Sequence, residues 1–306
     1  MLKLPALPPS AATVRAAARS TLTCAASQAD PTGQSDARGR QAIDAHMAST
    51  LDRFLFALAT GALLLVHAPA RADEAPADSL DASVEYSDVR IGARPATWRS
   101  QLLQWERRAD GGGLFAGMEQ RQRDHAADQL VHAGGFRVWE HWTLSGQLEK
   151  GLGAQFVPRH AAEAHVGYRL RPDAVLSIGH RHATYSGSNL RLWAASGLYY
   201  RGDAEWEVGY RHGTTGEPRQ RIAFGLARGQ WPCGARVTCG ARLSAGENVF
   251  GADEIGFDTG TGWIGGVHGE YRFHRGHRLR LEVGTGRADR FRQHTLNLTY
   301  RHVLDY

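Results

Sequence analysis

The last stretch of the chain alternates between two kinds of side chain. One set is mostly apolar or aromatic: His294, Leu296, Leu298, Tyr300, His302, Leu304 and Tyr306; the other is mostly polar: Thr295, Asn297, Thr299, Arg301, Val303 and Asp305. Side chains two positions apart share one face of a β-strand, so the pattern predicts a two-faced strand and fits no helix. Such a strand suits either a soluble sandwich or a membrane barrel whose apolar face meets lipid.

The same alternation recurs in segments of about ten residues separated by turn residues. The candidate strands are 82–90, 96–107, 113–122, 129–138, 141–151, 160–170, 174–184, 189–201, 204–214, 218–229, 238–247, 260–273, 277–287 and 293–305. Fourteen is even, as closure with both termini on one side requires; twelve is the alternative, because boundaries drawn from pattern shift by about two to four residues. The sequence therefore predicts an all-β chain with a single antiparallel transmembrane β-barrel over residues 82–306.

The connections between these segments also alternate in length. The even-numbered ones are mostly tight, as at Ala109-Asp110-Gly111-Gly112 and Gly202-Asp203, whereas an odd-numbered one, 246–259, is the longest break in the pattern. Outer-membrane barrels have short periplasmic turns and longer extracellular loops. The odd-numbered connections are therefore expected outside the cell.

Residues before the barrel have the pattern of an export signal. A largely apolar run at 54–66 follows Arg53 and precedes Ala70-Arg71-Ala72, a small-x-small cleavage pattern. The run is too short to span a bilayer comfortably but suits a secretory signal peptide, expected at 47–72. Residues 1–46 then read as an unstructured prefix or as sequence upstream of the true start at Met47, and residues 73–81 as a periplasmic lead-in.

Charge and cysteine content narrow the classes further. Removal of residues 1–72 takes away seven Lys/Arg and four Asp/Glu and lowers the formal net charge from +5 to +2, with no basic patch of the kind that binds nucleic acid. Cys233 and Cys239 remain, six residues apart, which suits a small disulfide loop in an oxidising periplasm. Two thiolates alone do not complete a metal site, and no cofactor or metal is expected.

Charged residues fall mostly on one face of the predicted strands, which predicts a polar lumen. The set expected to line it is Arg99, Glu119, Arg121, Glu149, Arg169, Arg181, Glu205, Glu207, Arg211, Arg221, Glu270, Arg272, Arg278, Arg280 and Glu282. Because both signs are interleaved, two interpretations stay open: a narrow, charge-selective channel, or a ladder of Arg–Glu pairs that plugs and stiffens the barrel.

Aromatic residues near strand ends predict girdles at the two membrane interfaces. The candidates are Trp98, Trp142, Trp206, Trp263, Tyr200, Tyr271, Tyr300 and Tyr306. In the last strand, Leu296, Leu298, Tyr300, Leu304 and Tyr306 are expected to serve as the terminal signal for membrane assembly.

Several local motifs resemble those of the YaiO-type outer-membrane proteins. They are Trp98-Arg99-Ser100-Gln101, Gly167-Tyr168, Gly179-His180-Arg181-His182-Ala183-Thr184-Tyr185, Ser244-Ala245-Gly246-Glu247-Asn248 and the closing strand, and the similarity extends over about 82–306. The resemblance implies a porin-like β-barrel in the outer membrane of a Gram-negative bacterium. It transfers no catalytic residue and no settled activity.

Three functions follow as hypotheses. The first is a non-enzymatic barrel, either a narrow polar channel or a structural component serving surface polysaccharide. The second is an enzyme that modifies lipid A or phospholipid, with His180, His182, Ser186 and Ser188 as candidates and Asp253 or Glu254 as the acid. The third is a soluble periplasmic sandwich. For the barrel, the expected partners are outer-membrane lipids, lipopolysaccharide, the barrel-assembly machinery and polysaccharide, but not nucleic acid.

Overall fold

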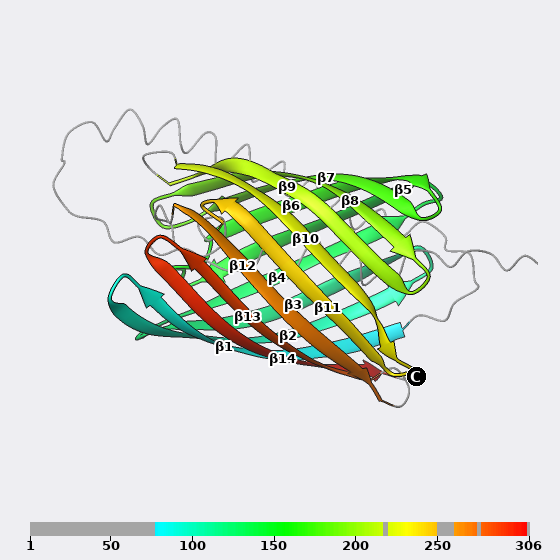
Figure 1. Ribbon diagram of the computed structural model, residues 1–306, viewed down its shortest axis with the longest axis horizontal. Helices are drawn as coiled ribbons and strands as arrows, with labels where there is room; N and C mark the ends of the chain where they lie inside the picture. Colours follow the sequence, from blue (N-terminus) through cyan, green and yellow to red (C-terminus); the bar gives the residue numbers. More distant parts are fainter. Residues whose placement is uncertain (1–76, 217–219, 250–259, 274–276, 305–306) are drawn as a thin grey trace, which may run out of the picture.

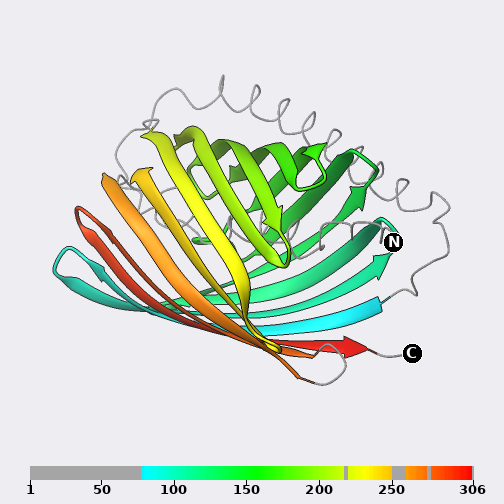
Figure 2. The same ribbon diagram turned by 45° about the vertical axis from the view of Figure 1, so that its right-hand side comes forward.

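A computed structural model describes residues 77–216, 220–249, 260–273 and 277–304. These residues form fourteen antiparallel strands closed into one barrel, in which every strand pairs with its neighbours in sequence and β1 pairs with β14. Figures 1 and 2 show the strands steeply tilted around the barrel, with the first strand (cyan) beside the last (red). The fourteen-stranded barrel predicted from the sequence is confirmed.

The strands have the following bounds: β1 Ala77–Ile91, β2 Arg94–Ala109, β3 Gly112–Arg123, β4 Ala126–Val138, β5 Trp142–Leu152, β6 His160–Arg171, β7 Ala174–Thr184, β8 Asn189–Arg201, β9 Ala204–Thr215, β10 Gln220–Gly234, β11 Val237–Glu247, β12 Thr261–Arg272, β13 Arg278–Ala288 and β14 Phe291–Leu304.

Closure is made by a continuous ladder between β1 and β14. The pairing runs from Asp78 opposite Leu304 to Ile91 opposite Phe291 without a break in register. Side chains add to the seam on the inner face, where the Thr299 hydroxyl lies 3.1 Å from that of Ser83. A sheet closed in this way has no edge strand, so its backbone N–H and C=O groups are satisfied by neighbouring strands.

The first strand begins earlier than the sequence pattern indicates. β1 starts at Ala77, so residues 77–81, expected in a periplasmic lead-in, are part of the barrel. Their polar side chains concealed the strand, because Ser79 and Asp81 are buried on its inner face. The expected signal peptide at 47–72 and the prefix at 1–46 lie outside the described residues.

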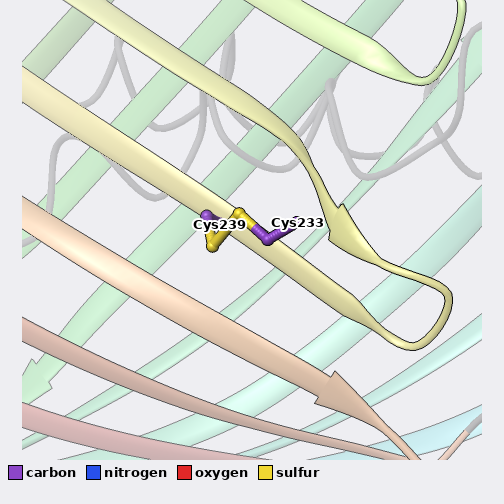
Figure 3. Close-up of a disulfide and its surroundings, with 2 residues drawn as sticks. All are labelled: Cys233 and Cys239. Carbon is purple, nitrogen blue, oxygen red and sulfur yellow. A yellow bond between two sulfur atoms is a disulfide. The ribbon is translucent and has the colours of Figure 1, made fainter.

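The connection that holds the cysteines is shorter than expected. β10 and β11 extend to a tight turn after Gly234, where the sequence pattern had indicated a longer connection over the same stretch. Cys233 and Cys239 form a disulfide across this hairpin, with Cα atoms 5.8 Å apart (Figure 3). The disulfide predicted from the cysteine spacing is therefore present, and it links two paired strands.

Every strand presents one face to the outside and one to the interior. On β1, for example, Val84 and Tyr86 are about half exposed, whereas Ser87 and Val89 are 1% exposed. The outer positions hold the exposed apolar residues and the inner positions hold most of the buried charges. Within the described ranges, no helix is long and apolar enough to cross a membrane.

The register of the closing seam can be tested by cross-linking. Ser83 and Thr299 are directly opposite in the β1–β14 ladder, at a Cα separation of about 4.5–5.5 Å that a disulfide can bridge. We expect the Ser83→Cys/Thr299→Cys variant to form an intramolecular disulfide under mild oxidation, detected as a mobility shift on a denaturing gel. The matched pair Ser83→Cys/Thr295→Cys places the second cysteine about 13 Å along the strand and is expected to stay reduced; equal cross-linking of both pairs would contradict this register.

Candidate functional site: the barrel lumen

The outer surface carries a broad apolar belt. Its members are exposed although they are large and apolar, among them Val84, Leu103, Met118, Val166, Ile178, Val208, Leu243, Val267, Leu281, Val283, Leu296 and Leu298. Monomeric water-soluble proteins rarely expose a contiguous apolar surface of this extent. The belt meets the requirement of a barrel wall that faces lipid.

Aromatic residues gather at the end of the barrel where β1 begins and β14 ends, which are the termini of the described barrel. Trp142, Tyr168, Trp206, Tyr271 and Tyr300 are all exposed on the outer face. Two pairs pack ring against ring: Trp142 with Tyr168 at 4.7 Å between centroids, and Tyr271 with Phe273 at 4.8 Å. These residues form the aromatic girdle expected at a membrane interface.

Two aromatic residues expected in the girdles lie elsewhere. The Trp98 side chain is inside the barrel, buried against Phe291 at 5.8 Å between ring centroids. Tyr200 lies on the inner face of β8, and Tyr306 lies outside the described residues. Position near a strand end thus did not reveal which face the ring takes.

Ion pairs line the polar part of the lumen, and the most buried one is centred on Arg181. Its guanidinium donates two hydrogen bonds to the Glu149 carboxylate, at 2.8 and 3.0 Å, and one to Glu163, at 3.2 Å. The three side chains are at most 5% exposed. His165 Nε2 lies 2.6 Å from the second oxygen of Glu163, so β5, β6 and β7 are joined by one hydrogen-bonded network.

A second group of ion pairs lies beside the closing seam. Arg301 on β14 donates to both carboxylate oxygens of Asp81 on β1, at 2.8 and 3.0 Å. Its other neighbour is Glu106 on β2, at 3.9 Å, and Glu106 in turn accepts a 2.8 Å hydrogen bond from Arg108. Opposite charges therefore tie the first, second and last strands together from inside.

A third group shows how small residues let charged side chains reach past a strand. Arg242 on β11 contacts Glu282 on β13 at 2.7 Å, across the intervening strand β12. A Cβ atom at Gly266 on β12 would lie 3.5 Å from both charged groups. Arg280 completes the group with a 2.6 Å hydrogen bond to Glu282.

Thirteen of the fifteen charged residues assigned to the lumen lie at inner positions of their strands. They are Glu119, Arg121, Glu149, Arg169, Arg181, Glu205, Glu207, Arg211, Glu270, Arg272, Arg278, Arg280 and Glu282. The assignments of Arg99 and Arg221 need correction, because both side chains lie on the outer surface. Arg99 packs over the outward-facing ring of Tyr86, and Arg221 forms an exposed ion pair with Glu247 at 3.7 Å.

Further lumen residues were missed from the sequence. They include Asp81, Glu106, Asp128, His132, Arg228, Arg242 and Arg301. Asp81 and Asp128 lie just before the strand starts expected from the sequence. Glu106 and Arg228 alternate out of phase with Arg99 and Arg221, the residues of the same strands that were assigned inward.

The interior changes character at the end opposite the termini, where apolar side chains replace the charges. We call this set the apolar collar: Val89, Ala96, Trp98, Leu130, Phe156, Val157, Ala161, Ala183, Tyr185, Leu190, Leu192, Ile222, Phe224, Val249, Ala288 and Phe291. Its members come from both sides of the barrel and are less than one-tenth exposed. The lumen is therefore polar toward the termini and apolar toward the longer connections.

The collar explains the two misassigned arginines and Trp98. Apolar-out alternation holds in the membrane belt, but inside the collar the inner positions are themselves apolar. On β2 this places Trp98 inward and Arg99 outward, and on β10 it places Ile222 inward and Arg221 outward. The face that carries the apolar residues is thus reversed at this end.

One connection contributes directly to the collar. The segment 153–159 between β5 and β6 turns inward, so that Phe156 and Val157 are almost fully buried against Leu130. One carboxylate oxygen of Asp128 accepts hydrogen bonds from three consecutive backbone N–H groups, those of Gln155, Phe156 and Val157, at 2.8, 2.7 and 3.0 Å. Asp128 is therefore the anchor that holds this segment inside the barrel.

Arg123 connects the inward segment to the rest of the collar. Its guanidinium lies 5.0 Å from the centroid of the Phe156 ring and 4.2 Å from that of Trp98. A cation between two aromatic faces is attracted by both. The segment 153–159 is thus linked through Arg123 and Trp98 to Phe291 on β14.

The residues proposed for a lipid-modifying enzyme are not gathered around a common point. His180 and His182 lie at outer positions of β7, and the His180 ring packs on Trp193 at 4.4 Å between centroids. Ser186 and Ser188 lie in the connection between β7 and β8, where Ser186 accepts a 3.3 Å hydrogen bond from Arg159. Asp253 and Glu254 lie outside the described residues.

Comparison with solved structures finds other barrels of the same general architecture. Outer membrane protein Omp33 of Acinetobacter baumannii has 9% identity and a TM-score of 0.47, over 74% of this chain and 99% of that one. The monoaromatic hydrocarbon channel CymD has 8% identity and a TM-score of 0.48, over 76% and 89%. The toluene transporter TodX of Pseudomonas putida has 10% identity and a TM-score of 0.45, also over 76% and 89%.

At these identities and TM-scores, the similarities carry no inference about what this chain transports or binds. No protein-family model matches the sequence, and no curated protein matches it. The closed strand order and the apolar outer belt decide the class. The chain is an outer-membrane β-barrel.

The Arg181 network provides a test of the lumen energetics. Replacing Arg181 by Ala leaves the carboxylates of Glu149 and Glu163 buried side by side without their cation. We expect the free energy of unfolding to fall by about 3–5 kcal/mol, measured by urea unfolding of protein inserted in lipid vesicles. The control is Arg171→Ala, which breaks the exposed pair with Asp173 and should cost no more than about 1 kcal/mol. Equal effects of the two substitutions would show that the Arg181 network is solvated.

Proposed function

We propose that the protein is a narrow, charge-lined channel of the outer membrane whose extracellular mouth is closed by the apolar collar in the conformation described. The observation that carries the proposal is the division of the lumen into a polar section and an apolar section. The polar section holds arginines and carboxylates on most strands of the barrel, so it offers partners to ions of either sign.

The mixed lining favours passage of small polar solutes over selection by one sign of charge. Arg181 is matched by two carboxylates, Arg301 by Asp81, and Arg228 by Glu207. Paired charges also narrow the lumen, because the side chains extend from neighbouring walls toward one another. The channel is therefore expected to be of low conductance.

The collar supplies the gate of the proposed channel. Hydrophobic constrictions in pores stop conduction by excluding water. The segment 153–159 can move without breaking a strand, because it connects β5 to β6, and its residues 155–157 are held through hydrogen bonds to Asp128. Opening then requires loss of those bonds, while the fourteen-strand wall stays intact.

The gate can be tested by electrophysiology. We expect the wild-type protein in planar lipid bilayers to show rare, small conductance steps. Asp128→Ala removes the acceptor of three N–H groups and should increase the open probability about tenfold or more, since each charge-assisted hydrogen bond contributes on the order of 1 kcal/mol.

A neighbouring carboxylate provides the matched control. Asp124 lies in the same β3–β4 hairpin but forms an exposed ion pair with Arg94 at 2.9 Å, so Asp124→Asn should leave the open probability unchanged. Silence of the wild type and of the Asp128 variant at every salt concentration and voltage would remove the channel proposal and leave the structural role.

We also propose, from the sequence motifs quoted above, that the chain belongs to the YaiO-type outer-membrane proteins and that it serves surface polysaccharide. The motif around Gly179 includes Arg181, which belongs to the ion-pair network, and Ala183, which belongs to the collar. The test is a deletion strain, in which surface polysaccharide should fall in amount or chain length and be restored by the wild-type gene. Unchanged polysaccharide would contradict this role without bearing on conductance.

A further inference from the structure

Three arginines form a continuous row on the outer surface of the barrel. Arg90 on β1 is directly opposite Arg292 on β14, and Arg292 is directly opposite Arg287 on β13. All three are exposed and occupy outer positions of their strands, the same face as Tyr86, Leu296 and Val283 in the apolar belt. Neighbouring strands are about 4.8 Å apart, so the three side chains leave the barrel wall from adjacent positions.

Such a row is unfavourable on its own. Like charges directly opposite on paired strands repel, and here the repulsion occurs twice. None of the three forms an ion pair with a carboxylate among the residues that the structure describes. Asp88, the acidic residue two positions before Arg90 on the same face, is opposite His294 and makes no ion pair with them.

Two other exposed arginines at this end have counter-charges from the protein. Arg94 pairs with Asp124 at 2.9 Å and Arg221 pairs with Glu247 at 3.7 Å. The arginine row differs from them in both respects, because its members are adjacent to one another and lack carboxylate partners in the described ranges. An anion from outside the chain would relieve the repulsion.

The position of the row identifies the source of that anion. The apolar belt ends at Tyr86, Leu296 and Val283, and the row lies four residues further along each strand, about 13 Å toward the hairpin ends. Trp263 on β12, exposed and directly opposite Arg287, continues the row with a residue that favours membrane interfaces. This is the end with the longer connections, the extracellular end of such barrels, so the row lies at the headgroups of the outer leaflet.

We propose that the arginine row of Arg90, Arg287 and Arg292 binds the phosphate groups of the phosphorylated glycolipid of the outer leaflet, lipopolysaccharide. Guanidinium groups match phosphate oxygens with paired N–H donors, and two adjacent arginines can share one phosphate. Acyl chains of the same lipid then lie along the apolar belt below. The inference does not depend on whether the lumen conducts.

The test compares lipid binding by two charge-matched variants in detergent micelles. Wild-type protein is titrated with bisphosphorylated lipid A and with dephosphorylated lipid A, and bound lipid is counted by native mass spectrometry. The triple substitution Arg90→Gln, Arg287→Gln and Arg292→Gln should weaken binding of the phosphorylated lipid about one hundredfold, and binding of the dephosphorylated lipid not at all.

The control variant removes three exposed arginines from the other end of the barrel, by Arg107→Gln, Arg171→Gln and Arg201→Gln, and should bind lipid A as the wild type does. Folding of each variant is checked by its heat-modifiable mobility on gels. Because the row is self-repelling, the triple variant should be at least as stable as the wild type in phosphate-free detergent.

The single substitution Arg292→Gln, at the centre of the row, should weaken binding about fivefold and provides the second variant.

Three outcomes would overturn the proposal. The first is unchanged affinity of the row variants for phosphorylated lipid A, and the second is an equal loss in the control variant. The third is displacement of the lipid by millimolar inorganic phosphate, which would indicate a site for a free anion. The same variants are also recorded in bilayers. Because the row lies outside the lumen, a loss of lipid binding with unchanged conductance bears on this proposal alone and not on the channel.

Discussion

The structure depends on the need to satisfy every backbone N–H and C=O group where no water is present. In lipid an unpaired strand edge is costly, and closure between β1 and β14 removes the two edges that fourteen consecutive antiparallel strands would otherwise leave. Once the sheet is closed, each strand has one face toward lipid and one toward the lumen. The two-residue period of the sequence therefore separates side chains that meet lipid from side chains that meet the lumen, and this separation places the charges of the polar lumen.

The lumen shows what that division permits. Buried charges are stable only when they are paired and hydrogen-bonded, and the main buried pairs of the lumen meet this condition with short contacts between adjacent or next-adjacent strands, as in Arg301 with Asp81 and Arg181 with Glu149. At the other end the wall bears aliphatic and aromatic side chains, and Asp128 satisfies three N–H groups of a connection that would otherwise carry unpaired donors into an apolar region. Polar lining and apolar collar are thus two solutions to the same burial problem.

The barrel and its strand count could be predicted because membrane strands repeat one simple pattern, and the terminal strand 291–304 shows it in full. The start of β1 could not, because Ser79 and Asp81 make its inner face resemble a polar lead-in. Arg99 and Arg221 were placed inside because charge was taken as a marker of the lumen, whereas the collar reverses that rule at one end. The arginine row needed the register between β13, β14 and β1, which pairs Arg90 with Arg292 across the closing seam and leaves no signal in local sequence.

The two ends of the barrel differ. One end contains the features that stabilise the fold, and the other contains the features on which the proposed functions depend. The end near the termini combines tight turns, a disulfide hairpin, the aromatic girdle and the ion-pair networks, all of which resist change. The opposite end carries the longer connections, a collar in which residues 155–157 are held at one carboxylate, and the arginine row. Release of residues 155–157 from Asp128 breaks three hydrogen bonds, whereas any motion of the wall breaks a ladder between strands. A conformational change is therefore confined to the extracellular mouth, at the level where the outer-leaflet lipid contacts the wall.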